Sequence, residues 1–371
     1  MIESRKQEGM KICILINTLR SGGAERQAVN LAKMLKDNGI DVSIVTYFGE
    51  NFFGNDLKEC GIPNVNLHCT KAVKAIHMTR KHLKHERYDA VIAFLRSPIL
   101  CACVASIFGK KWRLITRLGS CNTSFFSSSM GKLMMKLIRV TDCIVCNSNS
   151  EREMWLQHSM VVASKIRVIR NFYPDISVQV VPREKHEEHS RRILVIPASY
   201  SSIKNVRNVI RAAGMLDIDE RSRIEIHWYG HREIATGNTY EYDQSVRLVE
   251  ELGLKETVFL HDETKDIYDR MREADYVGLF SLFEGLPNAI CEAMLLGVPI
   301  AMSEVSDYHD LVNGNGFTCT QSAESIRDVL KRIIVTPESE RRDMGLRSFE
   351  NAKKMFSYEM LQNEWLDVLI G

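Results

Sequence analysis

The sequence contains no run of apolar residues long enough to cross a lipid bilayer as a helix. Its longest nearly apolar stretch, residues 97–109, has about a dozen residues, whereas a spanning helix needs about 20. The first nine residues are polar, and the apolar segment after them has the length of one short strand, so there is no sign of a secretory signal. We expect a cytoplasmic protein whose residues 1–9 form a disordered or non-native terminus ahead of a domain that begins at Met10.

Disulfide and metal frameworks are also missing. Ten cysteines are scattered along the chain, and Cys143 and Cys146 form a single C-x-x-C pair inside a strand-like segment. A zinc site would need a second pair or histidines at ligand spacing. No G-x-x-x-x-G-K-[ST] phosphate loop occurs either. We therefore expect buried, reduced thiols and no bound metal.

Charge of either sign is nearly balanced over the whole chain, at a net +2, but it is unevenly distributed. Residues 1–190 carry 28 Lys and Arg against 17 Asp and Glu, whereas residues 191–371 carry 21 against 30. A net charge of +11 on the first half and −9 on the second predicts that the first half meets an anionic partner.

Strands and helices alternate along most of the 371 residues, which are too many for one ordinary domain. The pattern is interrupted at residues 174–190, where two prolines and a run of charges indicate a linker. Alternation of this kind predicts parallel, doubly wound sheets. We expect an α/β protein with two Rossmann-like domains facing across a cleft, residues 10–180 and residues 191–356.

The predicted strands are short apolar segments bounded by turn residues. They lie at residues 11–17, 41–47, 90–95, 113–116, 143–146, 167–169, 192–197, 224–229, 258–260, 276–280 and 299–302.

The segment 281–299, SLFEGLPNAICEAMLLGVP, carries the clearest chemistry. Glu284 follows an apolar strand, where ligands bind in such sheets. Glu292 lies about one turn into the helix that follows. The amides at 285–289 open that helix, where unpaired N–H groups and the helix dipole favour an anion. A phosphate at the helix start with a carboxylate on either side would suit a sugar nucleotide. A surface glutamate and an ordinary N-terminal helix charge would give the same pattern.

This segment resembles the E-x7-E motif of glycosyltransferase family 4, in the form E-G-x-P-N-x-x-x-E-A-M-x-x-G-x-P. The sequence matches it at Glu284, Gly285, Pro287, Asn288, Glu292, Ala293, Met294, Gly297 and Pro299. Gly22-Gly23-Ala24-Glu25 is similar to the family's G-G-A-E turn, and Lys204-Asn205 to its K-N position. The final segment, FSYEMLQNEWLDVL, resembles the family's closing helix, which implies that a helix at 357–371 returns to the first domain. The resemblance covers essentially the whole chain from Met10.

The resemblance implies a retaining transfer of sugar from a nucleotide diphosphate sugar without a metal. It implies that Glu292 binds the donor ribose and that Glu284 faces the transferred sugar. Lys204, beside Asn205, would neutralise the leaving diphosphate. The amides of Gly285, Leu286 and Asn288, around Pro287, would meet the donor, and the Gly22-Gly23 turn would approach the diphosphate from the opposite side, which only glycine permits.

Two positions depart from the family pattern. The family has an Arg five residues before its Lys, whereas this sequence has Ser199 there, followed by Tyr200. A second cation for the diphosphate must therefore come from elsewhere. Arg207 is one candidate, although it could equally be a solvated residue on the surface of a helix. In place of a family His the first domain has Arg117, which either contacts an acceptor or leaving phosphate or has a structural role.

Asp217-Ile218-Asp219 spells the D-x-D metal motif of another glycosyltransferase fold, but it follows a helix, so we interpret it as a helix-ending loop.

The first half also carries an amphipathic basic segment at residues 125–140. It combines Lys132, Lys136 and Arg139 with Phe125, Phe126, Met130, Leu133, Met134, Leu137 and Ile138, and residues 71–87 add further basic side chains. This pattern fits a helix in an anionic membrane interface. It equally fits a helix packed on the sheet with its basic residues outside. The basic residues lack the interleaved aromatics and motifs of nucleic-acid binding.

Three functions remain consistent with these features. The first is an enzyme that moves a hexose or N-acetylhexosamine, UDP-linked in our prediction, to a glycan acceptor, lipid-linked in our prediction, in cell-surface polysaccharide biosynthesis at the inner face of the plasma membrane. The second is a non-hydrolysing nucleotide-sugar epimerase on the same architecture. The third is a non-catalytic sugar-nucleotide-binding subunit of a partner transferase. None of the three needs a resident cofactor.

Overall fold

The computed structural model describes residues 9–20, 22–69, 71–107, 109–119, 127–173, 176, 191–233 and 237–371. The chain divides into two compact units, residues 1–174 with 356–371 and residues 175–355. Residues 1–8 of the predicted N-terminal tail, 1–9, and most of the predicted linker lie outside the described residues. The domain boundaries at 180 and 191 therefore stay a prediction.

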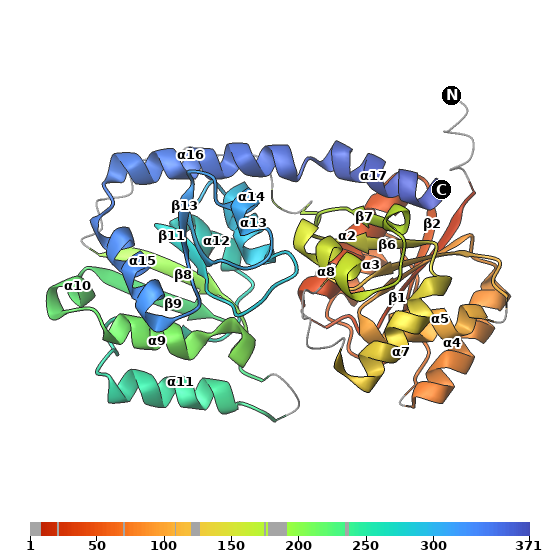
Figure 1. Ribbon diagram of the computed structural model, residues 1–371, viewed down its shortest axis with the longest axis horizontal. Coiled ribbons are helices and arrows are strands. Elements are labelled where there is room, and N and C mark those ends of the chain that lie inside the picture. The colour runs from red at the N-terminus through yellow and green to blue at the C-terminus, as the bar shows by residue number, and fades with distance from the viewer. Residues whose placement is uncertain are drawn as a thin grey trace. The chain divides into compact units, whose positions relative to one another are not determined.

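The first unit is built on a parallel sheet. Its described residues form seven strands in the order β3-β2-β1-β4-β5-β6-β7. These strands are β1 (Lys11–Ile16), β2 (Asp41–Thr46), β3 (Asn64–Asn66), β4 (Ala90–Phe94), β5 (Arg113–Arg117), β6 (Cys143–Cys146) and β7 (Ile166–Val168). Their helices are α2 (Gly23–Asp37), α3 (Gly54–Glu59), α4 (Ala72–Glu86), α5 (Arg96–Ile107), α7 (Ser129–Leu137), α8 (Asn149–His158) and α17 (Tyr358–Ile370), with 3₁₀ turns η1 (Ile138–Val140) and η2 (Ala163–Lys165). The strand order reverses between β1 and β4, as in a doubly wound fold. Helix α5 of this unit lies against both α4 and α7 (Figure 1).

The second unit repeats this architecture. Its described residues form six parallel strands in the order β10-β9-β8-β11-β12-β13. These are β8 (Arg192–Pro197), β9 (Ile224–Tyr229), β10 (Val258–His261), β11 (Tyr276–Leu279), β12 (Ile300–Ser303) and β13 (Gly316–Cys319). The helical elements are η3 (Ser202–Lys204), α9 (Val206–Gly214), α10 (Ile218–Ser222), α11 (Tyr240–Glu251), α12 (Ile267–Glu273), α13 (Asn288–Leu295), α14 (Tyr308–Leu311), α15 (Ala323–Val335) and α16 (Glu338–Met355). The reversal lies between β8 and β11.

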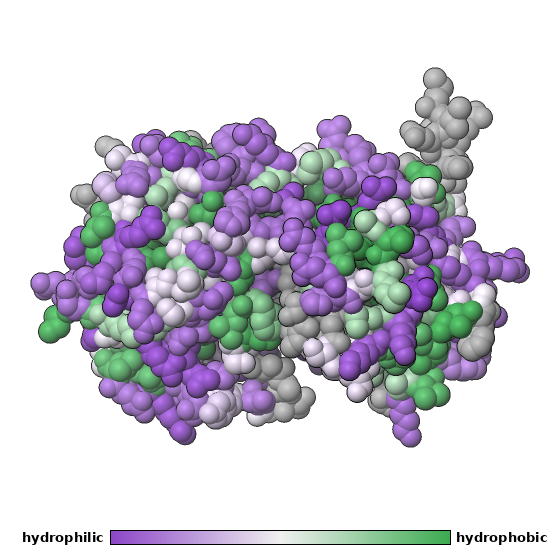
Figure 2. Space-filling view, in the orientation of Figure 1, coloured by the Kyte–Doolittle hydropathy of each residue, from purple (hydrophilic) through white to green (hydrophobic). Residues whose placement is uncertain are grey.

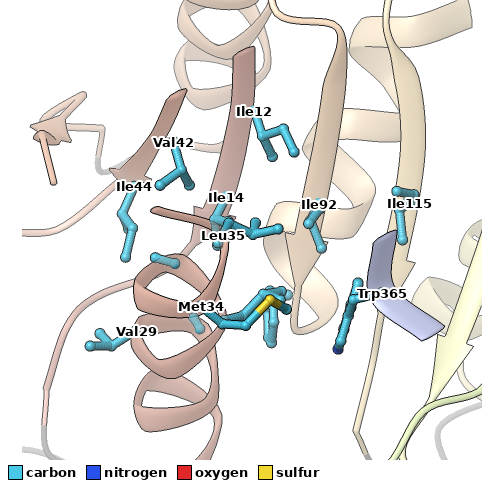
Figure 3. Packing of buried hydrophobic residues seen from close by; sticks show 14 of the residues in the cluster. Ile12, Ile14, Val29, Met34, Leu35, Val42, Ile44, Ile92, Ile115 and Trp365 are labelled. Carbon is cyan, nitrogen blue, oxygen red and sulfur yellow. The ribbon is translucent and has the colours of Figure 1, made fainter. Parts of the chain in front are cut away.

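Apolar side chains from both ends of the chain form one face of the core in the first unit. Ile12 and Ile14 of β1 lie beside Val42 and Ile44 of β2, and α2 covers them (Figure 3). Trp365 of α17, 3% exposed, joins the same cluster. The C-terminal helix therefore completes the core of the N-terminal unit, as the family resemblance implies.

The two Rossmann-like units confirm the predicted fold class, while their facing arrangement stays a prediction. The predicted strands all occur within two residues of their expected bounds at each end. The short strands β3 and β13 were not anticipated, because their sequences, Asn-Val-Asn and Gly-Phe-Thr-Cys, contain no continuous apolar run.

The C-x-x-C pair belongs to the core. Cys143 packs in the cluster on one face of the first sheet and Cys146 in the cluster on the other face. Side chains three apart on a strand point to opposite faces, so the two sulfurs cannot share a metal ion. The described cysteines are free thiols, and all of them except Cys60 are buried. The expectation of buried thiols is confirmed for them, apart from Cys60.

The D-x-D segment has a capping role. Asp217 follows α9 but begins a helix, so reading it only as a helix-ending loop was incomplete. Its side chain accepts a hydrogen bond from the amide of Glu220, whose carboxylate accepts one from the amide of Asp217 in return. This reciprocal cap satisfies two amides at the start of α10.

Candidate functional site

Two loops meet where the strand order of the second sheet reverses. Lys204 lies in η3, after β8, and Glu284 follows β11, the neighbouring strand. The amide of Leu282 donates to the carbonyl of Ile203 at 2.8 Å and so joins the two loops. Loops at this point of a doubly wound sheet lie at the carboxyl ends of the strands, where such folds bind ligands.

The loops bring together a cation, a carboxylate and a hydroxyl. The ammonium of Lys204 forms an ion pair with Oε1 of Glu284. The hydroxyl of Ser281, fully buried, donates to the same oxygen at 2.7 Å. The side chains of Lys204 and Glu284 are 25% and 14% exposed, so both are held in place yet reachable from solvent. The structure thus unites two of the predicted catalytic residues.

Asn205 positions Lys204. Its backbone adopts a left-handed conformation, φ 65°, which asparagine tolerates better than most residues. Its side-chain amide donates to the carbonyls of Phe280 at 3.0 Å and Gln321 at 2.9 Å. Because these contacts tie the Lys204 turn to the end of β11, Asn205 has a clear internal role at a position predicted to bind the donor.

The predicted anion-binding helix starts next to this pair. Gly285, Leu286 and Pro287 are buried, and α13 begins at Asn288. Pro287, the N-cap residue, makes no side-chain capping bond. The Ser306 hydroxyl donates to the Gly285 carbonyl and fixes the turn from the other side. The start of α13 therefore keeps the features that favour an anion.

Glu292 lies on the second turn of α13 and is 6% exposed. Burial of a carboxylate costs free energy unless hydrogen bonds or charges compensate it. The carboxylate therefore lies inside the fold on α13, at the position where the family resemblance implies a contact with the donor ribose.

Ser199, at the position of the missing family Arg, is followed directly by a structural residue. Tyr200 is fully buried, and its hydroxyl donates to the carbonyl of His261 at 2.8 Å. Arg207, the suggested replacement cation, pairs instead with Glu241 of α11, with Nε 3.0 Å from Oε2. Arg207 thus links α9 to α11, and the suggestion that it supplies the second cation is not supported.

The Gly22-Gly23 turn of the first unit follows β1, one of the two strands between which the strand order of the first sheet reverses. A Cβ atom on Gly22 would lie 2.3 Å from Oε2 of Glu25, so a larger residue here would displace the end of that side chain. Glu25 is 4% exposed and lies 3.4 Å from Nε of Arg20. Burial raises the pKa of the Glu25 carboxyl. Gly23 opens α2 and follows directly.

Arg117 is placed in the interior of the first unit. It is 4% exposed, and its guanidinium donates to the side chain of Asn171 at 2.6 Å and to the carbonyl of Ile169 at 3.2 Å. It also lies 5.3 Å from the ring centroid of Trp365. Burial lowers the pKa of Arg117 to about 10. These contacts tie β5 to the segment after β7 and to α17, and they favour the structural alternative.

Glu151 was missed by the sequence reasoning. Its buried carboxylate accepts hydrogen bonds from the amides of Gly119 at 3.0 Å and Asn147 at 2.9 Å. Burial raises the pKa of Glu151 to about 7, against the opposing effects of the Asn147 amide and the Arg117 charge. The carboxylate holds the loop after β5. A glutamate three residues after Ser148, the N-cap of α8, was the available sequence signal.

Comparison with known proteins agrees with this arrangement. Residues 21–175 match the family model described as Glycosyltransferase Family 4, and residues 180–353 match the one described as Glycosyl transferases group 1. The amylovoran biosynthesis glycosyltransferase AmsD of Erwinia amylovora is 21% identical over 97% of this chain and 99% of that protein.

Two further similarities also span nearly the full chain. The GalNAc-alpha-(1->4)-GalNAc-alpha-(1->3)-diNAcBac-PP-undecaprenol alpha-1,4-N-acetyl-D-galactosaminyltransferase of Campylobacter jejuni is 24% identical over 97% of this chain and 98% of that protein. The crystal structure of Anabaena Alr3699/HepE in complex with UDP and glucose superposes with a TM-score of 0.83 at 18% identity, over 97% of this chain and 99% of that one.

Fold, site and matches define the class of protein: it is a glycosyltransferase with two Rossmann-like domains. Within that class, the chain belongs to the family 4 type of glycosyltransferase.

Proposed function

We propose that this enzyme is a retaining glycosyltransferase that moves a hexose or N-acetylhexosamine from a UDP-sugar to a lipid-linked glycan in cell-surface polysaccharide biosynthesis. The observation that carries the proposal is the Lys204–Glu284 pair beside the start of α13. A cation and a helix N-terminus suit a departing diphosphate, and a carboxylate suits the hydroxyls of the sugar.

The comparisons support the choice of substrates. Alr3699/HepE was crystallised with UDP and glucose, and the Campylobacter jejuni relative is named for a saccharide on PP-undecaprenol. The Erwinia amylovora relative is named for the biosynthesis of amylovoran. We assign the diphosphate of the donor to Lys204, to the amides of the segment 285–288 and to the Gly22-Gly23 turn. We assign the transferred sugar to Glu284 and the ribose to Glu292.

Donor consumption with and without acceptor tests the proposal. UDP-glucose, UDP-galactose and their N-acetylated forms are incubated with lipid extract from the native host, and mass spectrometry follows UDP and lipid-linked product. Proton NMR of the product gives its anomeric configuration, which we expect to be α, as in the donor. Conversion of the donor sugar without acceptor would indicate an epimerase. UDP-sugar binding without turnover would indicate a non-catalytic subunit.

Turnover is expected to survive chelation. The Lys204 ammonium and the amides that open α13 can hold a diphosphate without a divalent cation. We expect the rate in excess EDTA to stay within about twofold of the untreated rate, since the preorganised charges remain. Loss of turnover in EDTA, restored by Mg²⁺ or Mn²⁺, would contradict this assignment.

A basic surface on the first unit supports binding to an anionic membrane. Lys132, Lys136 and Arg139, on α7 and η1, are exposed, and Met130 and Leu133 are 52% and 46% exposed. Helix α5 packs against both α7 and the basic helix α4. Hydrophobic and hydrophilic atoms lie side by side over this region (Figure 2). We call Met130, Lys132, Leu133, Lys136 and Arg139 the α7 surface.

Part of the predicted apolar face is used internally. Met134 and Ile138 are fully buried, so they are not available for insertion, and Leu137 is half-buried. Phe125 and Phe126 lie outside the described residues. The α7 surface therefore combines features of both sequence interpretations. Among the described residues, no helix is both long enough and apolar enough to span a membrane.

We expect the enzyme to sediment with anionic vesicles at low salt and less with neutral ones. Basic side chains near such a surface contribute about 1 kcal/mol each, so Lys132→Glu, Lys136→Glu and Arg139→Glu together should weaken binding by at least about 100-fold. Salt should act similarly, because the Debye length falls from about 10 Å at 0.1 M to about 3 Å at 1 M. The matched control is a triple Glu variant at Arg342, Lys353 and Lys354, exposed residues of α16. Equal loss of vesicle binding in the two triple variants, or no binding of the wild type to anionic vesicles, would contradict a membrane-binding role for the α7 surface.

A further inference from the structure

The loop between β2 and α3 exposes two aromatic rings. Phe48 is 44% exposed and Phe52 is 56% exposed, although the next residue, Phe53, is 7% exposed. Single exposed apolar residues are common on protein surfaces, but two exposed phenylalanines on one short loop make a candidate binding surface. We call residues 47–53 the aromatic loop.

The aromatic loop is fixed in place by its backbone. The amide of Leu19 donates to the carbonyl of Glu50 at 3.0 Å, and the amide of Phe52 donates to the carbonyl of Leu19 at 2.7 Å. At its other end, the amide of Phe48 donates to the carbonyl of Asn17 at 3.1 Å. Phe52 also meets the edge of Phe53, with ring centroids 5.0 Å apart and an interplanar angle of 82°. The loop thus holds its rings on a rigid support, which lowers the entropy cost of binding a partner.

This support lies beside the glycine turn. Leu19 and Arg20 connect β1 to Gly22, so the aromatic loop pairs with the same segment that leads into the turn. Both belong to the carboxyl edge of the first sheet, where doubly wound folds bind ligands. The aromatic loop therefore lies at the same edge of the sheet as the glycine turn, on the acceptor domain of the proposed enzyme.

Polar groups around the rings match a carbohydrate. Glu50 and Asn51 are exposed between the two phenylalanines, and the side-chain nitrogen of Asn66 lies near Gly49, 3.9 Å from where a Cβ would be. Sugar sites combine a flat apolar surface with a few polar groups that fix orientation.

The local charge argues against a phospholipid as the occupant. Residues 47–60 hold Glu50, Asp56 and Glu59 against Lys58 alone, in a half of the chain that is otherwise strongly basic. An anionic headgroup would be repelled here, whereas sugar hydroxyls can donate to carboxylates. The α7 surface, with the opposite charge, is the better place for lipid.

We propose that Phe48 and Phe52 form a binding site for a pyranose ring of the acceptor glycan. The apolar face of the ring stacks on the phenylalanines while its hydroxyls bond to Glu50, Asn51 and Asn66. This proposal rests on the proposed function, because it takes a glycan as the second substrate. It adds a site that selects the acceptor, separate from the residues that hold the donor.

Saturation-transfer NMR with methyl α-glycosides of glucose, galactose, N-acetylglucosamine and N-acetylgalactosamine tests the site directly. We expect transfer to the ring C–H protons of at least one glycoside in the wild type, with about a tenfold weaker affinity in Phe52→Ala and Phe48→Ala. Phe52→Trp should keep the affinity. Phe52→Leu should lose it, because leucine is apolar but presents no flat ring. Tyr240→Ala, which removes an aromatic side chain of 58% exposure on α11, is the matched control.

The outcomes separate this proposal from the function it rests on. Unchanged glycoside affinity in both alanine variants with wild-type melting temperatures would overturn it, as would a Phe52→Leu variant that binds like the tryptophan variant, which points to a lipid chain. The proposed function fails differently, through absent UDP release by the wild type with host lipid. Donor affinity, measured with UDP by calorimetry, should be equal in wild type and in all Phe48 and Phe52 variants.

Discussion

Replacing Lys204 by alanine is expected to lower kcat by about 10²–10³-fold, because one preorganised positive group at a developing charge contributes on this scale. Departure of the nucleoside diphosphate concentrates negative charge beside the start of α13, and Lys204 is held there by Asn205 and by its pair with Glu284. The loss should appear in kcat more than in KM, since the charge develops during transfer. Steady-state UDP release with saturating donor measures it.

The matched control is another Lys–Glu pair of the same unit. Lys331 lies 2.8 Å from Glu220, with 44% and 21% of the two side chains exposed. Lys331→Ala should leave kcat unchanged, because an exposed ion pair contributes little to stability and this one involves neither Lys204 nor Glu284. A Lys204→Ala enzyme that keeps wild-type kcat and melting temperature would show that the leaving group is stabilised elsewhere.

The sequence predicts most of the fold because its central strands are strongly patterned. Arg192–Pro197 is a mostly apolar segment and Ile224–Tyr229 alternates buried apolar residues with half-buried ones, and both strands occur at the predicted residues. The two missed strands, β3 (Asn-Val-Asn) and β13 (Gly-Phe-Thr-Cys), lack the apolar run that identifies an equally short strand such as β6, Cys-Ile-Val-Cys. Those strands are formed by pairing with β2 and β12, which is information outside their own sequence.

The candidate site follows the same division. Lys204 and Glu284 could be singled out because each follows a strand, and parallel strands end at one edge of the sheet. The ion pair between them could not be predicted from the sequence. It depends on β8 and β11 being neighbours in the sheet, although 80 residues separate the two side chains along the chain. Nor could the sequence distinguish Asn205 as a positioning residue, because its partners Phe280 and Gln321 are distant along the chain.

Roles set by tertiary burial were the least predictable. Arg117 looks like a ligand-binding cation in the sequence, yet Asn171 and Trp365, from two other segments, surround it. Met134 and Leu133 are adjacent and equally apolar, but only Met134 faces the core. Local propensity does not distinguish such neighbours, because the side that packs is decided by the sheet beneath.

Replacing Glu292 is expected to weaken UDP binding by about 1.5–3 kcal/mol, or about 10- to 150-fold in Kd, because hydrogen bonds to charged groups are of this strength. The carboxylate is 6% exposed on α13, the helix that begins at the proposed diphosphate site. Glu292→Gln keeps the shape and removes the charge, whereas Glu292→Ala removes both, so the two together separate hydrogen bonding from packing. Calorimetry with UDP gives the affinity, and thermal melting without ligand reports the fold.

The nucleotide itself supplies the decisive comparison. If Glu292 binds the ribose hydroxyls, the wild type should bind 2′,3′-dideoxy-UDP more weakly than UDP, and Glu292→Gln should reduce that difference because the charged partner is gone. Glu241→Gln, a buried glutamate of α11 that pairs with Arg207, is the matched control and should discriminate as the wild type does. If Glu292→Gln kept the full wild-type ratio between its Kd values for 2′,3′-dideoxy-UDP and UDP, Glu292 would not bind the ribose, even if the overall affinity were lower.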